Sequence, residues 1–145
     1  MDFSQDLKTI VELFNECRLE WDVFYPPINI EQLHNATLAN FKKFICVTDD
    51  NTGCMLGHID DCFSNNRIHI AYNDLIMVST KRCVSDFHAL ASLDVLLNAF
   101  EVWARENNAT RIHWTMHTGK WQTVQKLLAH RYKAKQTGIS LVTEL

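Results

Sequence analysis

Three strand-like segments followed by one long helical segment dominate the middle of this sequence. Residues 41–48, 54–62 and 67–78 are rich in the β-branched and aromatic residues that favour strands. The turn sequence DDNTG at 49–53 separates the first two segments, and SNN at 64–66 separates the second from the third. Because short turns join antiparallel neighbours, these segments predict an antiparallel meander.

The segment from about Asp86 to Asn107 has apolar side chains at helical spacing. This stripe comprises Phe87, Leu90, Leu93, Leu97, Phe100 and Ala104. A strand at 110–117 follows, and a helix that joins two strands makes them parallel neighbours, so 110–117 should lie beside 67–78. An amphipathic helix follows Gly119. We expect five large side chains to be mostly buried: Leu90, Leu97, Phe100, Trp114 and Leu128.

Helices are expected near both ends of the strand-rich region. The first covers about 5–20, a Tyr-Pro-Pro sequence stops it, and a second covers about 30–40. Residues 132–145 are predicted to hold one or two strands. The fold class is therefore α/β, with a mixed central sheet that contains the antiparallel meander and is flanked by helices, in a single domain over 1–145.

Composition disfavours several classes of protein. A formal net charge of −3 gives no general attraction to nucleic acid, and no apolar run approaches the roughly 20 residues of a membrane helix. The first residues lack the apolar core of a secretory signal. The five cysteines are scattered without a CxxC motif, so they are expected to be reduced thiols of an intracellular protein.

The sequence resembles the GNAT acetyltransferases, and most of all the small GNAT-like proteins carried by tailed bacteriophages. Residues 67–75 (RIHIAYNDL) look like the central strand of that family, and 96–106 (LLNAFEVWARE) look like the helix after its cofactor loop. The HTG sequence at 117–119, followed by the helix that ends in HRY at 130–132, is similar to the closing strand–helix–strand. The resemblance implies a GNAT-like sheet over nearly the whole chain.

The window that corresponds to the family's cofactor loop lacks the family's glycines. GNAT enzymes carry Gln/Arg-x-x-Gly-x-Gly/Ala there, because backbone N–H groups must approach the pyrophosphate of acetyl-CoA closely. Here the window is 88–93 (HALASL), with His88 at the Gln/Arg position and Leu93 at the second small position. We therefore expect the helix to begin near Asp86 and to run through the window. Should acetyl-CoA bind, the resemblance assigns it to Val78, Lys81, Arg82, His88, Ala89 and Ala91.

The family often uses a tyrosine of its last helix to protonate the leaving thiolate. Leu127 stands at that position, and Tyr132 falls where the family has an aromatic core residue. His113 and His117 alternate on the strand that lies near the acetyl group in the family, so they are the candidate general bases. His58, Asp60 and Cys62 also share one strand face, but no fourth ligand follows them, and no metal site is predicted.

Two functions remain open. The missing glycines and the missing tyrosine favour a non-catalytic GNAT-fold protein without a cofactor, as the resemblance to phage proteins also implies. It would be a structural or host-interaction component, located in the virion or the bacterial cytoplasm, with another phage or host protein as its partner and with neither membrane nor nucleic acid. The alternative is an acetyl-CoA-dependent N-acetyltransferase with an atypical loop.

Overall fold

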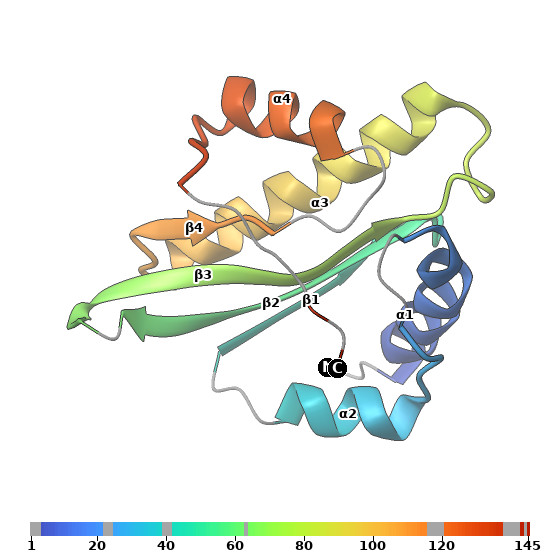
Figure 1. The fold of residues 1–145 in the computed structure, drawn as a ribbon, viewed down its shortest axis with the longest axis horizontal. Coiled ribbons are helices and arrows are strands. Elements are labelled where there is room, and N and C mark those ends of the chain that lie inside the picture. The colour runs from blue at the N-terminus through green and yellow to red at the C-terminus, as the bar shows by residue number, and fades with distance from the viewer. Residues whose placement is uncertain are drawn as a thin grey trace.

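The computed structural model describes residues 4–21, 25–38, 42–62, 64–115 and 121–137, together with 143 and 145. Two helical layers enclose one sheet (Figure 1). In chain order the elements are α1 (Ser4–Cys17), η1 (Arg18–Glu20), α2 (Ile30–Leu38), β1 (Lys42–Val47), β2 (Gly53–Cys62), β3 (Asn65–Val78), α3 (Asp86–Glu106), β4 (Arg111–His113) and α4 (Trp121–Arg131).

The sheet has the order β1-β2-β3-β4. The strands β1, β2 and β3 pair antiparallel, and β4 pairs parallel to β3, so the predicted meander and the helical crossover are both confirmed. The register of β2 and β3 shifts where Leu56 pairs with Leu75 but Gly57 pairs with Asn73. This shift leaves Asp74 as an extra residue in β3, which is a β-bulge.

The parallel strand β4 is shorter than the sequence predicts. Only Arg111–His113 pair with β3, against an expected strand over 110–117, of which 116 and 117 lie outside the described residues. The physical reason is the side chain of Asn73. Its Nδ2 donates to the carbonyl oxygen of Thr115 at 2.7 Å, and its Oδ1 accepts from the Thr115 N–H at 2.6 Å. An amide side chain thus stands where backbone pairing would otherwise continue, so the two strands separate.

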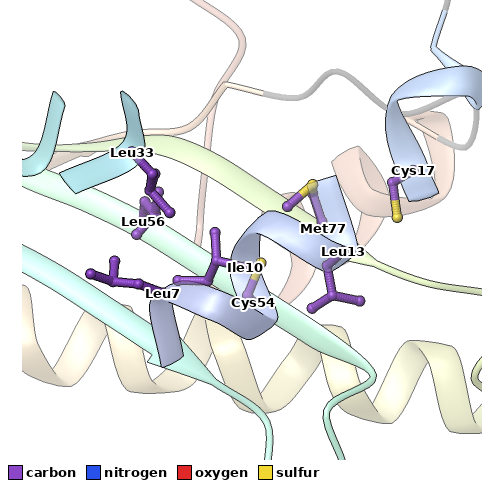
Figure 2. Close-up of a cluster of buried hydrophobic side chains, with 8 residues drawn as sticks. All are labelled: Leu7, Ile10, Leu13, Cys17, Leu33, Cys54, Leu56 and Met77. Carbon is purple, nitrogen blue, oxygen red and sulfur yellow. The ribbon is translucent and has the colours of Figure 1, made fainter. Parts of the chain in front are cut away.

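Apolar clusters fill the space between the sheet and the helices. On one face, α1 and α2 pack against β2 and β3 around the buried residues that Figure 2 shows: Leu7, Ile10, Leu13, Cys17, Leu33, Cys54, Leu56 and Met77. On the other face, α3 packs Leu96, Phe100 and Ala104 onto the sheet. Leu93 and Leu97 of α3 face Val124 and Leu128 of α4. In the described part of the chain, no helix is long and apolar enough to cross a membrane.

Three of the five predicted core residues are buried, and one prediction is wrong. Leu97, Phe100 and Leu128 are at most 5% exposed, and Trp114 is half-buried. Leu90 is 40% exposed and its neighbour in the stripe, Phe87, is 82% exposed. The reason is geometric, since the buried part of α3 begins only at Ser92 and its first turns extend beyond α4 and rise away from the sheet (Figure 1).

The segment after α4 is also not the predicted strand where it is described. Residues 132–137 have no regular structure, while 138–142 and 144 lie outside the described residues. Lys133 has a φ of 56°, and the Ala134 N–H donates to the Leu128 carbonyl at 3.1 Å. These features end α4 with a reversal of the chain, so the residues directly after the helix do not form a strand.

Candidate functional site

The first turn of α3 lies where the resemblance places the pyrophosphate of acetyl-CoA. Ser85 caps this helix, because its side chain accepts a hydrogen bond from the His88 N–H at 3.1 Å. The Ala89 N–H donates to the Ser85 carbonyl at 3.1 Å. The helix then continues without interruption to Glu106. The expectation that it runs through the 88–93 window is confirmed, so these N–H groups already have partners.

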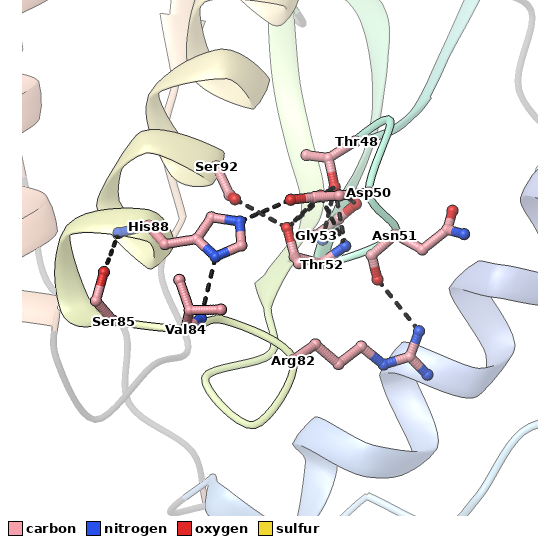
Figure 3. A network of polar contacts seen from close by, with 10 residues as sticks. All are labelled: Thr48, Asp50, Asn51, Thr52, Gly53, Arg82, Val84, Ser85, His88 and Ser92. Atoms are coloured by element: carbon pink, nitrogen blue, oxygen red, sulfur yellow. Dashed lines mark hydrogen bonds and ion pairs between the residues drawn. The ribbon is translucent and has the colours of Figure 1, made fainter.

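His88 joins the start of α3 to the β1–β2 turn. Its Nε2 lies 2.6 Å from Asp50 Oδ2, and its Nδ1 accepts from the Val84 N–H at 3.1 Å (Figure 3). An Nδ1 that accepts a hydrogen bond carries no proton, so the proton of the neutral ring sits on Nε2 and is donated to Asp50. Both ring nitrogens are thus occupied by protein groups.

Asp50 is the centre of the network drawn in Figure 3. Its Oδ1 accepts from the hydroxyl groups of Thr52 at 2.6 Å and Thr48 at 2.9 Å. The Thr52 hydroxyl, followed by His88, holds the pKa of Asp50 well below its usual range. Thr52 Oγ1 also lies 2.8 Å from Ser92 Oγ on α3. Asn51 takes a φ of 58°, a conformation that asparagine tolerates well, and so lets the turn close around Asp50.

The cation closest to this turn is also neutralised within the protein. Arg82 Nε donates to Glu16 Oε2 at 3.0 Å, its Nη2 contacts Glu16 Oε1, and its Nη1 donates to the Asn51 carbonyl at 3.1 Å. Glu12 lies 3.9 Å from Nη2. The hydrogen bond with Arg82 lowers the pKa of Glu16, and the same bond raises the pKa of Arg82.

The other predicted cofactor residues surround the same junction between β3 and α3. Lys81 and Ala91 are exposed, Ala89 is half-buried, and Val78 packs partly into the clusters beneath α3. The structure therefore brings this part of the predicted set into one region. Lys81 is the member whose charged side chain extends from the surface there, next to the Arg82–Glu16 pair.

A second polar group lies on the sheet face opposite α3. His58, Tyr72 and His113 are in register across β2, β3 and β4. The His58 ring stacks on Tyr72 with a centroid separation of 5.2 Å, and His113 meets Tyr72 edge-on at the same distance. Asp74, the bulge residue, lies 2.7 Å from His58 Nδ1. His113 is thus placed beside Tyr72, whereas His117 lies outside the described residues.

Comparison with protein-family models gives no match, and comparison with curated proteins gives none. The fold, in contrast, matches several solved acetyltransferases. An aminoglycoside acetyltransferase from an uncultured soil metagenomic sample, solved with trehalose, has a TM-score of 0.69 at 14% identity, covering 97% of this chain and 91% of its own. Glucosamine-6-phosphate N-acetyltransferase from Arabidopsis thaliana has a TM-score of 0.67 at 10% identity, covering 99% and 94%. An acetyltransferase from Trypanosoma brucei has 0.61 at 14%, covering 94% of both chains. The chain has the GNAT acetyltransferase fold.

The closing helix of this GNAT fold carries no tyrosine at the expected acid position. Leu127 packs partly into the cluster between α3 and α4. A leucine side chain has no ionisable group, so it cannot protonate a thiolate. Tyr132 lies against Trp114, and its hydroxyl donates to Asp94 at 3.4 Å. Burial, with help from Asp94, raises the pKa of Tyr132 to about 12. Tyr132 is therefore a protonated packing residue at neutral pH.

His58, Asp60 and Cys62 alternate on β2 as predicted, but they do not converge on a common point. His58 contacts Asp74, the Asp60 carboxylate accepts from the Asp61 N–H, and Cys62 contacts the Ser64 hydroxyl. Within the ranges that the structure describes, no group of three His, Cys, Asp or Glu side chains is placed to hold a metal ion.

The sequence does not indicate several residues of these sites, among them Glu16, Asp50, Thr52 and Ser92. The DDNTG segment indicates a turn, and nothing in it indicates that Thr52 contacts Ser92, 40 residues further along the chain. The one usable signal was the concentration of hydroxyl and carboxylate side chains around Asp50, which exceeds what a turn requires.

Proposed function

We propose that this GNAT-fold chain is a non-catalytic binding module that does not use acetyl-CoA. The observation that carries this proposal is that His88 and Arg82, the ligand-like side chains at the pyrophosphate position, are both paired with carboxylates of the protein itself. A pyrophosphate would have to displace Asp50 or Glu16 from these partners. The resulting competition between like charges disfavours binding.

The backbone of the same region supports the proposal. GNAT loops hold phosphate through bare backbone N–H groups at a helix start. Here Ser85 caps the helix, and the N–H groups of His88 and Ala89 donate to Ser85. The exposed side chain of Lys81 adds at most about 1 kcal/mol of attraction. We therefore expect a dissociation constant for acetyl-CoA no tighter than the order of 1 mM, or about −4 kcal/mol.

The proposed partner of this module is another protein. The resemblance to small GNAT-like proteins of tailed bacteriophages supports a phage or host protein as that partner, and a place in the virion or the bacterial cytoplasm. The formal net charge of −3 argues against nucleic acid as the partner, because phosphate contacts need a basic surface.

Calorimetric titration of acetyl-CoA into the purified protein tests the proposal. We expect no saturable heat up to about 1 mM ligand, and no rise in melting temperature, because a ligand of the native state would stabilise it. Lys81→Ala is the matched variant, since Lys81 is exposed and Arg82 is needed for its contacts with Glu16. Saturable micromolar binding that Lys81→Ala weakens would overturn the proposal.

One observation favours a second function, an N-acetyltransferase with an atypical loop. The Asp74 carboxylate contacts His58 Nδ1, and a histidine whose proton is held on Nδ1 presents Nε2 as a base. The stacked Tyr72 and the adjacent His113 complete a polar row on the sheet. The test is to incubate the protein with acetyl-CoA and amines and to measure the release of coenzyme A. Release by the wild type that is lost in His58→Gln would establish this function. Release that His58→Gln leaves unchanged would exclude His58 as the base.

A further inference from the structure

Positive charge is concentrated in one part of this chain. Residues 107–143 contain six of the 14 lysines and arginines and none of the 17 aspartates and glutamates. The rest of the chain is therefore strongly acidic, although the formal net charge of the whole is only −3. Such an asymmetry gives the molecule one surface that attracts anions and others that repel them.

The chain reversal after α4 folds this basic segment back onto itself. The Ala134 N–H donates to the Leu128 carbonyl at 3.1 Å, and Gln125 Nε2 donates to Gln136 Oε1 at 3.4 Å. Residues 133–136 therefore run back along α4, and the helix and the returning segment share one outer surface.

Four exposed basic side chains gather on this surface, which we call the basic patch: Lys126, His130, Lys133 and Lys135. Lys126 and His130 are four residues apart on α4, so they lie on the same side of the helix. Lys133 and Lys135 flank Ala134, which packs against the cluster between α3 and α4. None of the four basic side chains forms an ion pair with another residue that the structure describes.

The acidic groups of the protein lie elsewhere. Asp94 of α3 is paired with Arg131, which is therefore not counted in the basic patch. The helices on the other side of the sheet carry five described carboxylates: Asp6, Glu12, Glu16, Glu20 and Glu31. The sheet and α3 separate that layer from α4 (Figure 1), so it cannot neutralise the patch by direct contact.

We propose that the basic patch binds an acidic segment of the partner protein. α4 has 11 residues and is about 16 Å long, which is the length of about five residues of extended chain. Lysine suits this task, because its flexible ammonium group acts as a point charge and requires no fixed geometry of the carboxylate. The inference rests on the proposed function only in that the partner is a protein, and it does not depend on whether acetyl-CoA binds.

Nucleic acid fits this surface less well. A strand carries a negative charge at every nucleotide and would continue past a patch about 16 Å long onto the acidic remainder of the molecule. The patch also contains no Trp, Tyr or Phe ring, whereas single-stranded nucleic acid is commonly held by stacking on such rings. A short acidic peptide can contact the patch alone.

Fluorescence anisotropy of a labelled peptide of about six glutamates, with protein up to about 1 mM in about 20 mM salt, tests the proposal. We expect a dissociation constant on the order of 0.1–1 mM, which weakens severalfold at about 150 mM salt because exposed charges are screened. A peptide of six glutamines should not bind.

Two charge reversals on exposed helical lysines locate the binding surface. Lys126→Glu should weaken binding about fivefold, because one attraction is lost and one repulsion is added. Lys8→Glu is the matched control, since it changes the net charge equally on α1, across the sheet from α4, and should leave binding almost unchanged. Lys126→Gln, which removes the charge without reversing it, should have a smaller effect, and circular dichroism confirms that each variant is folded.

Three outcomes would overturn the proposal. These are no binding by the wild type, equal weakening by Lys126→Glu and Lys8→Glu, or tighter binding of a single-stranded DNA of about six nucleotides than of the glutamate peptide. The titration with acetyl-CoA is independent of this test. Saturable binding of acetyl-CoA would refute the proposed function and leave the patch intact, while failure of the peptide to bind would refute only the patch.

Discussion

Replacing Gly57 by alanine tests how tightly α3 is packed on the sheet. A Cβ at Gly57 would lie 2.4 Å from Phe100 Cε2 and 2.7 Å from the Tyr72 carbonyl oxygen. Carbon atoms in contact normally stay about 3.5–4.0 Å apart, so the helix must move outward by about 1 Å or the strands must separate. Neither movement is cheap, because Phe100 is fully buried and its ring lies 5.2 Å from that of Phe44.

The expected loss is about 2–3 kcal/mol in the free energy of unfolding. Overpacking costs typically 1–3 kcal/mol, and the short contact with a backbone oxygen puts this site near the upper limit. About 0.5 kcal/mol of this loss is offset, because alanine reduces the conformational entropy of the unfolded chain relative to glycine. For a chain of this size, the net loss corresponds to a melting temperature lower by roughly 4–12 °C. Urea denaturation followed by tryptophan fluorescence measures it.

Two comparisons sharpen the result. Gly53→Ala should cost less, because its Cβ would meet one backbone oxygen at 2.9 Å and side-chain atoms of Leu96 and Val78 at 3.1 and 3.2 Å. Phe100→Leu should lose less stability in the Gly57→Ala background than in the wild type, since a smaller side chain relieves the clash. A loss below about 0.5 kcal/mol for Gly57→Ala, or strict additivity with Phe100→Leu, would refute the reasoning.

Three further predictions concern the core and the charged network. Phe100→Ala should lower the free energy of unfolding by about 3–5 kcal/mol in urea denaturation, and a loss under 1 kcal/mol would mean that its burial contributes little. Asp50→Asn should cost about 1 kcal/mol at pH 7, since the half-exposed carboxylate loses charge-assisted hydrogen bonds. Because the folded pKa of Asp50 is depressed, its contribution is present above about pH 4 and disappears as the pH falls further, so wild type and Asp50→Asn should converge in acid. Arg82→Gln and Glu16→Gln should show a coupling energy of about 0.5–1 kcal/mol in a double-mutant cycle, and strict additivity would argue against their ion pair in solution.

The fold followed from the sequence because its signals were local. The turn at 49–53 and the long helical stripe predicted the meander and the parallel crossover, and both are present. Resemblance to a known family then gave the architecture. The predicted burial of Leu90 is wrong, because periodicity identifies an apolar stripe but not which turns of the helix have other elements packed against them.

The contacts at the site join residues that are far apart in the sequence, and the sequence does not show which of them meet. His88 was identified as a departure from the family loop, but its partner Asp50 is 38 residues away in the chain. The contact of His58 with Asp74 depends on a bulge that shifts the register of β3, and a one-residue shift reverses which face a side chain occupies. The sequence could therefore show that family features are missing, but not which side chains occupy their place.

The claim that the acetyl-CoA position is filled by the protein's own groups can be tested residue by residue. At 16.8 kDa the chain suits amide-resolved NMR, with acetyl-CoA added to about 1 mM. We expect the amide signals of Ser85, His88 and Ala89 to stay in place, and the His88 ring to keep its proton on Nε2. Saturable shifts centred on these three amides, together with release of His88 from Asp50, would contradict it.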